Sequence, residues 1–282
     1  MSNSIKLFSP PYKPVEANLK RRSLTALVIV PLVIYVVGWG QETVFTLVVL
    51  GVTSLALYEY FHMALPAHRG EQKLGFLFGL ALALLTIAPS LAGREIWLAL
   101  VLVLIFSIYV FVAGELYDRM TRLSWLLLGG FYIGLLMPHW VFLFRYPGGR
   151  SWVFFTLAVV MGGDTAAYFV GRRFGVRKLA PEISPGKTWA GAWGYMAGAL
   201  ILGVLAAQFL FVQHSFLEIV ALALLLATLG QVGDLFESLL KRVFNVKDSS
   251  SLVPGHGGIL DRLDSLIFPA VFANAYLKVF DS

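Results

Sequence analysis

Long apolar runs joined by short polar connections dominate the chain. Nine of these runs reach about 20 residues, the length that a helix needs to cross a hydrocarbon core of roughly 30 Å. They extend over approximately 23–40, 43–65, 74–92, 95–114, 124–144, 151–171, 189–213, 217–238 and 263–280. None of them alternates apolar and polar residues as a barrel strand does, and a helix satisfies its backbone hydrogen bonds within one segment. The pattern predicts an all-α polytopic integral membrane protein with about nine transmembrane helices.

The composition supports this class of protein. Hydrophobic residues make up 58% of the 282 residues and charged residues only 13%, whereas a soluble domain carries about 25% charged residues. The first span is longer than the roughly 7–15 apolar residues of a signal peptide, and no clear small-residue cleavage site follows it, so we expect it to remain in the protein. The absence of cysteine excludes disulfides, thiolate metal ligands and a cysteine nucleophile.

Basic residues gather on one side of the predicted bundle. With nine spans, the amino-terminal tail and the connections after the second, fourth, sixth and eighth spans share one face. That face carries 18 of the 22 Lys and Arg residues, namely Lys6, Lys13, Lys20, Arg21, Arg22, Arg69, Lys73, Arg119, Arg122, Arg172, Arg173, Arg177, Lys178, Lys187, Lys241, Arg242, Lys247 and Arg262. Because positive charge stays cytoplasmic, we expect the amino terminus inside, in a bacterial inner (plasma) membrane. This topology also explains the net charge of +6, so we expect no nucleic-acid partner.

The polar chemistry of the spans lies in the carboxyl-terminal half. Residues 1–22 are expected to form a flexible cytoplasmic tail and residues 23–150 the first five transmembrane helices, with few charges. Residues 151–282 are expected to hold helices six to nine, together with two cytoplasmic loops, 172–188 and 239–262. Acidic residues inside the flanking spans make this half the candidate catalytic part.

The first constellation of candidate residues begins with Asp164, in "MGGDTAAYFVGRRFG", which lies within the sixth span. A charge at the bilayer centre costs roughly 2.5–3.5 kcal/mol, so it is normally paired or faces a watery cavity. A helix-packing role, with a hydrogen bond to a neighbouring Thr or Tyr, is the alternative.

The segment "SPGKT" (184–188) follows in the next loop. It is not a Walker loop, because Pro181 stands where that motif needs glycine. What remains is a lysine, Lys187, with two hydroxyls, Ser184 and Thr188, at the expected start of a helix. A helix N-terminus favours phosphate through its free N–H groups and dipole.

A second constellation lies in "GQVGDLFESLLKR" (230–242). Asp234, Glu237, Ser238 and Lys241 are spaced i, i+3, i+4, i+7 and therefore share one helix face. An exposed ion pair between Glu237 and Lys241 would account for two of them. Asp234 lies one turn deeper, where that explanation weakens.

The third constellation is "PGHGG" followed by "DRLDS" (261–265). Asp261 and Asp264 lie one turn apart at the start of the ninth span. Helix N-capping employs one Asp but does not explain two Asp residues together with Asp234 on the adjacent helix. Hard carboxylate ligands without thiolates suit Mg²⁺ rather than Zn²⁺, and Mg²⁺ completes its shell with water and substrate phosphates.

Together these groups predict chemistry at phosphorus. Transfer at a nucleotide's phosphorus brings two anions together, and carboxylate-held metal with Lys and Arg groups neutralises their charge. The best metal ligands are Asp234 and Asp261. The candidates for phosphate and pyrophosphate are Lys241, Arg242, Lys247 and Arg262.

The segment "SLLKRVFNVKDSSSLVPGHGGILDRLD" (238–264) resembles the signature of phosphatidate cytidylyltransferases, also called CDP-diacylglycerol synthases. The matching positions are Ser238, Lys241, Arg242, Lys247, Asp248, Pro254, His256, Gly257, Gly258, Asp261, Arg262 and Asp264. "GGDTAAYFVG", "SPGKTW" and "GDLFES" also resemble segments of that family. Two departures are Val253, where a larger aliphatic residue is usual, and Ala190, where Glu or Gln is common. The resemblance covers about 160–270, and in the first five spans only hydropathy supports it.

The resemblance implies the reaction of CTP with phosphatidate to give CDP-diacylglycerol and pyrophosphate, with Mg²⁺, in a homodimer whose site faces the cytoplasm. A second cation is left open. It implies Asp234 and Asp261 as metal ligands, and as further candidate catalytic residues Lys247, Asp248, His256 and Asp264. Asp248 and Asp264 are expected to orient basic groups or the metal's surroundings, and His256 to contact phosphate. The candidate substrate-binding residues are Asp164, Ser184, Lys187, Thr188, Ser238, Lys241, Arg242 and Arg262.

The sequence also bears on three alternative functions. A secondary transporter predicts acids near the midplane and broken helices in both halves, whereas the acids here lie near one face of one half. A CTP-dependent enzyme acting on another lipid phosphate or a lipid alcohol remains an alternative. A non-catalytic scaffold would not require the Asp–Lys–His spacing.

Overall fold

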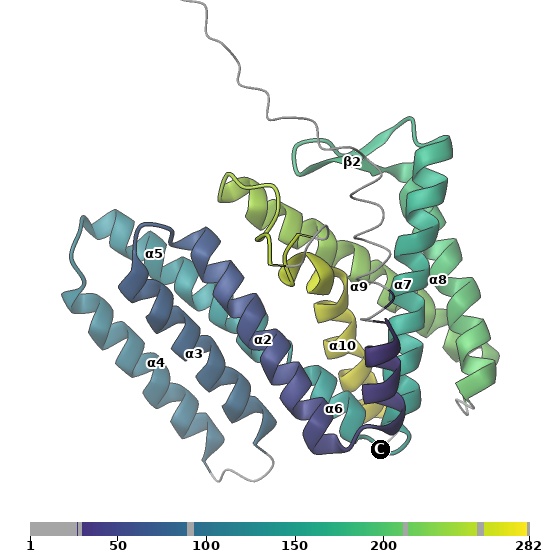
Figure 1. Ribbon diagram of the computed structural model, residues 1–282, viewed down its shortest axis with the longest axis horizontal. Coiled ribbons are helices and arrows are strands. Elements are labelled where there is room, and N and C mark those ends of the chain that lie inside the picture. Colours follow the sequence, from purple (N-terminus) through teal and green to yellow (C-terminus); the bar gives the residue numbers. More distant parts are fainter. Residues whose placement is uncertain (1–26, 28–29, 89–92, 211–213, 253–256, 281–282) are drawn as a thin grey trace, which may run out of the picture.

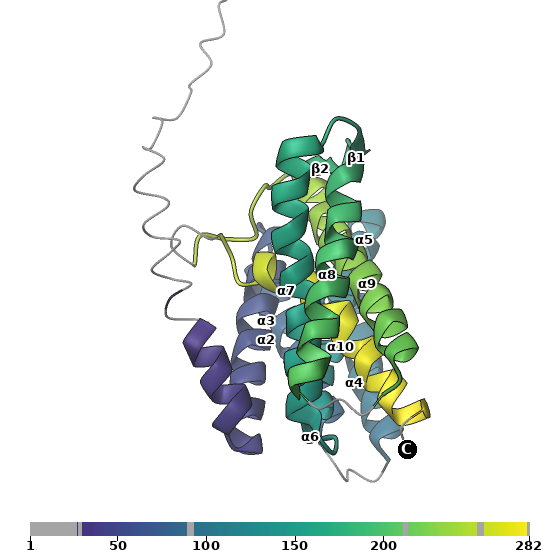
Figure 2. The same cartoon turned by 90° about the vertical axis from the view of Figure 1, so that its right-hand side faces the viewer.

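The computed structural model describes residues 27, 30–88, 93–210, 214–252 and 257–280. The expected amino-terminal tail, residues 1–22, lies outside the described residues. A bundle of long, nearly aligned helices forms the molecule (Figures 1 and 2). Its elements are a helical segment Val30–Trp39, α2 (Glu42–Ala64), α3 (Arg69–Ile87), α4 (Arg94–Phe111), α5 (Leu116–Gly129), η1 (Gly130–Leu135), α6 (His139–Arg145), α7 (Gly149–Phe174), β1 (Lys178–Ala180), β2 (Ser184–Thr188), α8 (Trp189–Leu210), α9 (Phe216–Val243) and α10 (Leu260–Phe280).

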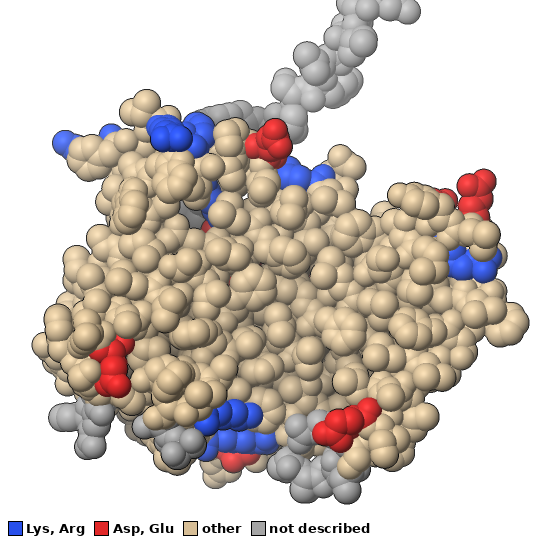
Figure 3. All heavy atoms as spheres, turned by 180° about the vertical axis from the view of Figure 1, so that it is seen from behind, with Lys and Arg blue, Asp and Glu red and all other residues tan. Residues whose placement is uncertain are grey.

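Helical structure occurs in all nine predicted spans, and the polytopic all-α prediction is confirmed. Seven helical spans in the described part of the chain are long and apolar enough to cross a membrane, while Val30–Trp39 and Glu95–Phe111 are shorter apolar helices. Many large apolar side chains on the outside are exposed, as expected for surfaces that contact lipid. Figure 3 shows a broad middle belt of the molecule with few charges, and charged side chains mainly toward the two ends.

The fifth predicted span is a composite of three pieces. It runs over Leu116–Arg145, where α5 passes into the π-helical η1 and then, after Pro138, into α6. Proline has no N–H to donate and fits the start of a new helix better than a helix interior. Gly134 of η1 lies against the backbone of Gly79 on α3, where a Cβ would collide with the Gly79 carbonyl. The absence of a side chain at Gly134 therefore lets the backbones of η1 and α3 approach closely.

Small residues also bring the helices of the second half together. α7 and α8 pack side by side along their length (Figure 1). Gly198 on α8 lies against Ala166 and the Gly162 carbonyl of α7, so an added Cβ would have no space. Gly233 on α9 likewise lies against the backbone carbonyl of Asp264 on α10. Small residues permit such close approach in helix bundles within lipid, where van der Waals packing drives association.

One end of the bundle, called here the hairpin end, differs from the sequence-based expectation. The expected start of a helix at "SPGKT" is instead strand β2, paired antiparallel with β1 between α7 and α8. The hairpin lies at the same end as the loop between α9 and α10, and the carboxyl end of α10 lies at the other end (Figure 1). Helix α8 begins only at Trp189. The hydroxyl of Thr188 accepts a hydrogen bond from the Gly191 amide at 3.1 Å and so caps this helix.

Candidate functional site

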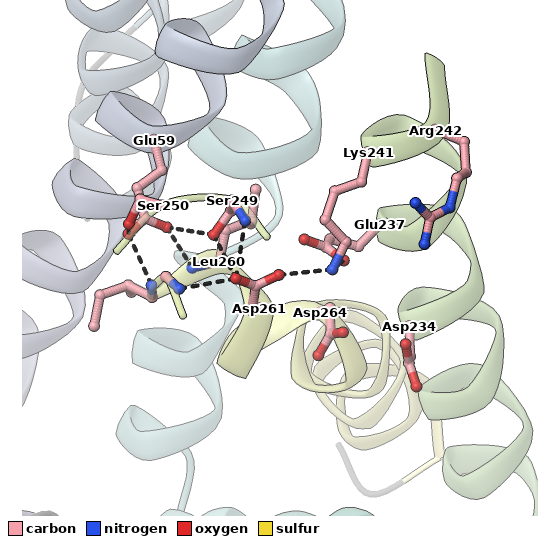
Figure 4. Close-up of polar contacts among 12 residues, drawn as sticks. Glu59, Asp234, Glu237, Lys241, Arg242, Ser249, Ser250, Leu260, Asp261 and Asp264 are labelled. Carbon is pink, nitrogen blue, oxygen red and sulfur yellow. Dashed lines mark hydrogen bonds and ion pairs between the residues drawn. The ribbon is translucent and has the colours of Figure 1, made fainter. Parts of the chain in front are cut away.

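The first turn of α10 holds Asp261 in a ring of donors (Figure 4). Its Oδ2 accepts hydrogen bonds from the backbone amides of Ser249 at 2.9 Å and Gly258 at 2.8 Å, and lies 2.9 Å from the Ser249 hydroxyl. Gly257 has a φ of +79°, a left-handed conformation that favours glycine. A Cβ at Gly257 would also lie 2.8 Å from the same carboxylate oxygen. The glycines of this segment therefore allow its backbone to wrap around Asp261.

Lys241 of α9 joins two carboxylates. Its Nζ lies 2.6 Å from Oδ1 of Asp261 and 2.5 Å from Oε2 of Glu237. The side chains of Lys241, Glu237 and Asp261 are 12%, 0% and 10% exposed. The sequence suggested an exposed ion pair between Glu237 and Lys241. The pair forms, but that interpretation was wrong about its surroundings, because α10 packs over this face of α9 and adds Asp261 as a second partner.

A groove of about 350 Å³ lies between α7, β2, α8 and α9. Its polar lining includes Asp164, Lys187, Tyr195, Gln231 and Asp234. The Nζ of Lys187 lies 2.6 Å from the Asp234 carboxylate, and the two side chains are 24% and 30% exposed. The hairpin thus places the lysine of "SPGKT" against the acid of "GDLFES". The sequence suggested a shared function for these two segments but not their direct contact.

A third carboxylate, Asp264, lies near the two aspartates that line this groove, Asp164 and Asp234. Asp164 and Asp264 both interact electrostatically with Asp234 and with each other. The Ser265 hydroxyl donates to Asp164 at 3.2 Å, while Asp264 is buried and accepts from the Ser265 amide at 2.7 Å. Figure 4 shows Asp264 on α10 and Asp234 on the neighbouring α9. Cations act on this cluster as well: Lys187 and Arg262 attract the Asp164 carboxylate.

Two buried hydroxyls beside the carboxylates lack a partner within the described part of the chain. They belong to Tyr132 of η1 and Tyr195 of α8. Tyr132 interacts electrostatically with Asp264, Glu237 and Asp234, and Tyr195 with the three aspartates of the cluster. A buried polar group is normally hydrogen-bonded. Tyr195 lines the groove itself, so its hydroxyl is available to a polar group that enters there.

The remaining predicted residues occupy different places. Arg242 is exposed on α9 and its Nε donates to the Ile183 carbonyl of the hairpin at 3.0 Å, which ties α9 to the hairpin. Ser238 is buried on α9 and Ser184 is half-buried in β2. The side chains of Lys247 and Asp248 are exposed in the α9–α10 loop. His256 lies outside the described residues, so the structure does not place it.

Sequence reasoning missed Glu59, on α2. Its side chain is buried, and it binds the α9–α10 loop from the first half of the chain (Figure 4). An acid in the middle of the apolar stretch "LALYEYFHM" was the available signal, because buried acids are normally paired or hydrogen-bonded.

The acids of the site suit a Mg²⁺ ion that takes only one or two of its ligands from the protein. Mg²⁺ takes one or two protein carboxylates and keeps several waters. Asp234 is partly exposed in the groove, and Asp164, which interacts with it electrostatically, lines the same groove. Asp261 fits less directly, because Lys241 and three other donors already occupy its oxygens. Across the described ranges, no group of three or more His, Asp or Glu side chains is arranged to hold an ion without further ligands.

The fold and the site define a class: polytopic membrane enzymes whose polar groove lies at one end of the helix bundle. The chain belongs to the cytidylyltransferase family, whose family model matches residues 20–280. This membership makes the protein a nucleotidyltransferase.

Relatives similar over most of the chain carry one name, phosphatidate cytidylyltransferase. The relative from Bacillus subtilis is 32% identical over 277 residues, covering 93% of this chain and 99% of its own length. The relative from Pseudomonas aeruginosa is 36% identical over 261 residues, covering 88% and 93%. One from Brucella suis is 34% identical over 270 residues, covering 94% and 95%.

Proposed function

We propose that this protein transfers CMP from CTP to phosphatidate, which yields CDP-diacylglycerol and pyrophosphate. The observation that carries the proposal is the groove in which Lys187 meets Asp234 beside Asp164 and Asp264. It lies at the hairpin end of a membrane bundle, where a lipid phosphate and a water-soluble nucleotide can meet. The names of the relatives support phosphatidate as the acceptor.

The reaction is a substitution at the α-phosphorus of CTP. An oxygen of the phosphatidate phosphate forms the new P–O bond, the bond between the α-phosphorus and the bridging oxygen breaks, and pyrophosphate leaves with the electron pair. The nucleophile is already an anion, so no protein group has to remove a proton from it. Catalysis therefore depends on positioning and on neutralising charge.

Basic residues at the hairpin end are suited to the phosphates. We assign contacts with the triphosphate and the departing pyrophosphate to Lys187, Lys241, Arg242, Lys247 and Arg262. Ser184 and Ser238 remain proposed polar contacts, whereas Thr188 already serves as a helix cap. Asp248, Asp264 and His256 remain proposed to orient the phosphates and the basic groups.

Asp234 and Asp261 are the proposed ligands of Mg²⁺, which when bound would neutralise phosphate charge and hold attacking and leaving oxygens in line. For Asp261 to contribute, Lys241 would have to exchange part of its ion pair for a substrate phosphate. Lys241 has a second carboxylate, Glu237, within 2.5 Å, so its charge stays compensated during that exchange.

The proposed site faces the cytoplasm, where CTP is made, in a bacterial inner membrane. The basic residues of the hairpin end support this orientation through the positive-inside rule. At the other end of the described bundle lie Arg145, Arg150 and Lys278. The family resemblance also supports a homodimer.

The test uses purified protein in liposomes with CTP and phosphatidate, with and without Mg²⁺, following pyrophosphate and lipid-linked CMP. Asp234→Asn is expected to lower kcat by about 100-fold or more, in the range found for removing one charge-stabilising group. Asp118→Asn is the matched control, because Asp118 is exposed at the start of α5, and it should keep wild-type activity.

Three results would count against parts of the proposal. A folded wild-type protein that uses another lipid phosphate, and not phosphatidate, would overturn the acceptor. Full activity in Asp234→Asn would overturn the role of the groove. Product formed equally well in the presence of a chelator would overturn the dependence on Mg²⁺.

A further inference from the structure

Glu59 is a buried acid far from the sequence motifs, in the half of the chain without recognisable chemistry. It lies on α2 and is 1% exposed. Both carboxylate oxygens accept hydrogen bonds from the segment that leads into α10. Oε1 accepts from the Ser250 hydroxyl at 2.5 Å and the Ile259 amide at 2.9 Å. Oε2 accepts from the Leu260 amide at 2.8 Å and lies 2.9 Å from the Ser249 hydroxyl.

This carboxylate caps α10 from another helix. Helix α10 begins at Leu260, and the first amides of a helix have no partner within the helix. A carboxylate at this position bonds to those amides and also interacts favourably with the helix dipole. Helix caps usually come from the residue that precedes the helix. Here the cap comes from α2, so the start of α10 is held in place by the amino-terminal half.

Ser249 connects this cap to the candidate site. Its hydroxyl lies 2.9 Å from Glu59 and 2.9 Å from Asp261, and its amide donates to Asp261. Asp261 in turn holds Lys241 at 2.6 Å. Space around the bridge is tight, because a Cβ at Gly258 would collide with the Ser249 hydroxyl and lie 2.5 Å from the Glu59 carboxylate. A shift of Glu59 would therefore move the partners of Asp261.

We propose that Glu59 is a positioning residue for the cytidylyl transfer: by capping α10 and binding Ser249 and Ser250, it sets the orientation of Asp261 and hence of Lys241. This inference rests on the proposed function. It assigns a role to the first half of the chain, for which the sequence had offered only hydropathy. Glu59 contacts no reacting atom itself and acts through the α9–α10 loop.

The decisive variant is Glu59→Gln, which keeps the shape of the side chain. Its NH₂ group would face a backbone amide of the loop that can only donate, either Ile259 or Leu260, so at least one of the four bonds would be lost. Misplacement of a catalytic group by about 1 Å can lower the rate about 100-fold. We expect kcat to fall by roughly that factor. The KM for CTP should change less than about 3-fold, because Lys187 keeps its contact with Asp234 and Lys241 keeps its ion pair with Glu237.

Glu71→Gln is the matched control. Glu71 is another shielded acid in the first half, with a side chain 11% exposed, and it accepts from Arg122 at 2.9 Å and Tyr109 at 2.7 Å. These bonds join α3, α4 and α5 without touching the α9–α10 loop. The control should lower the melting temperature of the protein while keeping kcat within about 3-fold of wild type.

Amide hydrogen exchange supplies a readout that does not depend on activity. In Glu59→Gln the amides of Ile259 and Leu260 should exchange at least about 10-fold faster than in wild type, and in Glu71→Gln at the wild-type rate. Should Glu59→Gln fail to fold, Ser250→Ala removes only one donor. We expect it to lower kcat several-fold and to speed exchange at Ile259.

The outcomes separate the two proposals. A wild-type protein without cytidylyl transfer would refute the proposed function, while the exchange rates would still test the cap. Wild-type kcat in a folded Glu59→Gln or Ser250→Ala protein would overturn the positioning role. Equal losses of kcat in Glu59→Gln and Glu71→Gln, in proportion to their melting temperatures, would also overturn it and leave Glu59 as a stabilising residue only.

Discussion

Replacing Lys241 by methionine tests the buried charge network of the site. The side chain of methionine is similar in length but has no charge. The substitution removes the partner of both Glu237 and Asp261, whose side chains are 0% and 10% exposed. Asp261 keeps its three donors from Ser249 and Gly258. Among the described residues, Glu237 loses the only cation that pairs with it and is left beside the Asp261 carboxylate.

The expected loss of stability follows from this imbalance. Removing one partner of a buried ion pair lowers the free energy of unfolding by about 3–5 kcal/mol, because a charge is left buried without compensation. For a chain of this size, about 1 kcal/mol shifts the melting temperature by roughly 2–4 °C. Lys241→Met should therefore melt roughly 6–20 °C below wild type. It should also lose cytidylyl transfer, because a proposed phosphate contact is gone.

Intrinsic fluorescence of the seven tryptophans, recorded during heating in detergent, measures the shift. The double variant Glu237→Gln, Lys241→Met should recover part of the stability, since it removes the uncompensated charge while activity stays low. Lys278→Met is the control: Lys278 is exposed and lies 5.0 Å from the Phe142 ring, a contact worth about 0.5–1 kcal/mol. About 1 kcal/mol corresponds to a shift of roughly 2–4 °C in the melting temperature. If Lys241→Met melts within about 2 °C of that control, the reasoning about the buried ion pair is refuted.

Three further predictions follow from the packing and topology. Gly233→Ala should lower the free energy of unfolding by about 1–3 kcal/mol, because its Cβ would collide with the Asp264 carbonyl. The control Gly51→Ala, which has nothing within 4 Å of the added Cβ, should be neutral or slightly stabilising. Equal melting temperatures of the two variants would contradict the close crossing of α9 and α10. Thr188→Val should cost about 0.5–2 kcal/mol by removing the cap of α8, and Thr188→Ser should restore it; a Val variant as stable as Ser would show that the bond to Gly191 contributes nothing. Because the chain has no cysteine, single introduced cysteines report the orientation of the protein in the membrane. Val176, beside the hairpin, is 91% exposed, and Val176→Cys should not react with a membrane-impermeant maleimide in intact cells. Pro147→Cys, at the other end of the bundle, should react, and the reverse pattern would place the site outside.

Much of the site could be predicted residue by residue, because helical periodicity is a local property. The spacing of Asp234, Glu237 and Lys241 places them on one face whatever surrounds the helix, and the structure has them on α9 together. The same local argument failed at "SPGKT". There, the segment pairs as a strand with Lys178–Ala180 instead of forming a helix. The ion pair between Lys187 and Asp234 also stabilises the strand. Both partners lie outside the five residues, so the segment by itself does not reveal them.

Contacts between side chains and backbone groups that lie far apart in the chain could not be predicted from the sequence, for a different reason. Glu59 binds loop residues between 190 and 201 positions away, and nothing in the local composition says which acid meets which amide. Burial of Lys241 likewise depends on α10 packing over α9, which the pattern of a single helix does not reveal.

The amino-acid sequence by itself determined the membrane class, the helical character of the apolar runs and the chemical groups of the candidate site, because apolar length and helical spacing act within each segment. Tertiary structure alone decided which groups meet: Lys187 with Asp234, Lys241 with two carboxylates, and Glu59 with the start of α10. Those contacts depend on how closely glycine-bearing helices approach one another and on which buried charges then find partners.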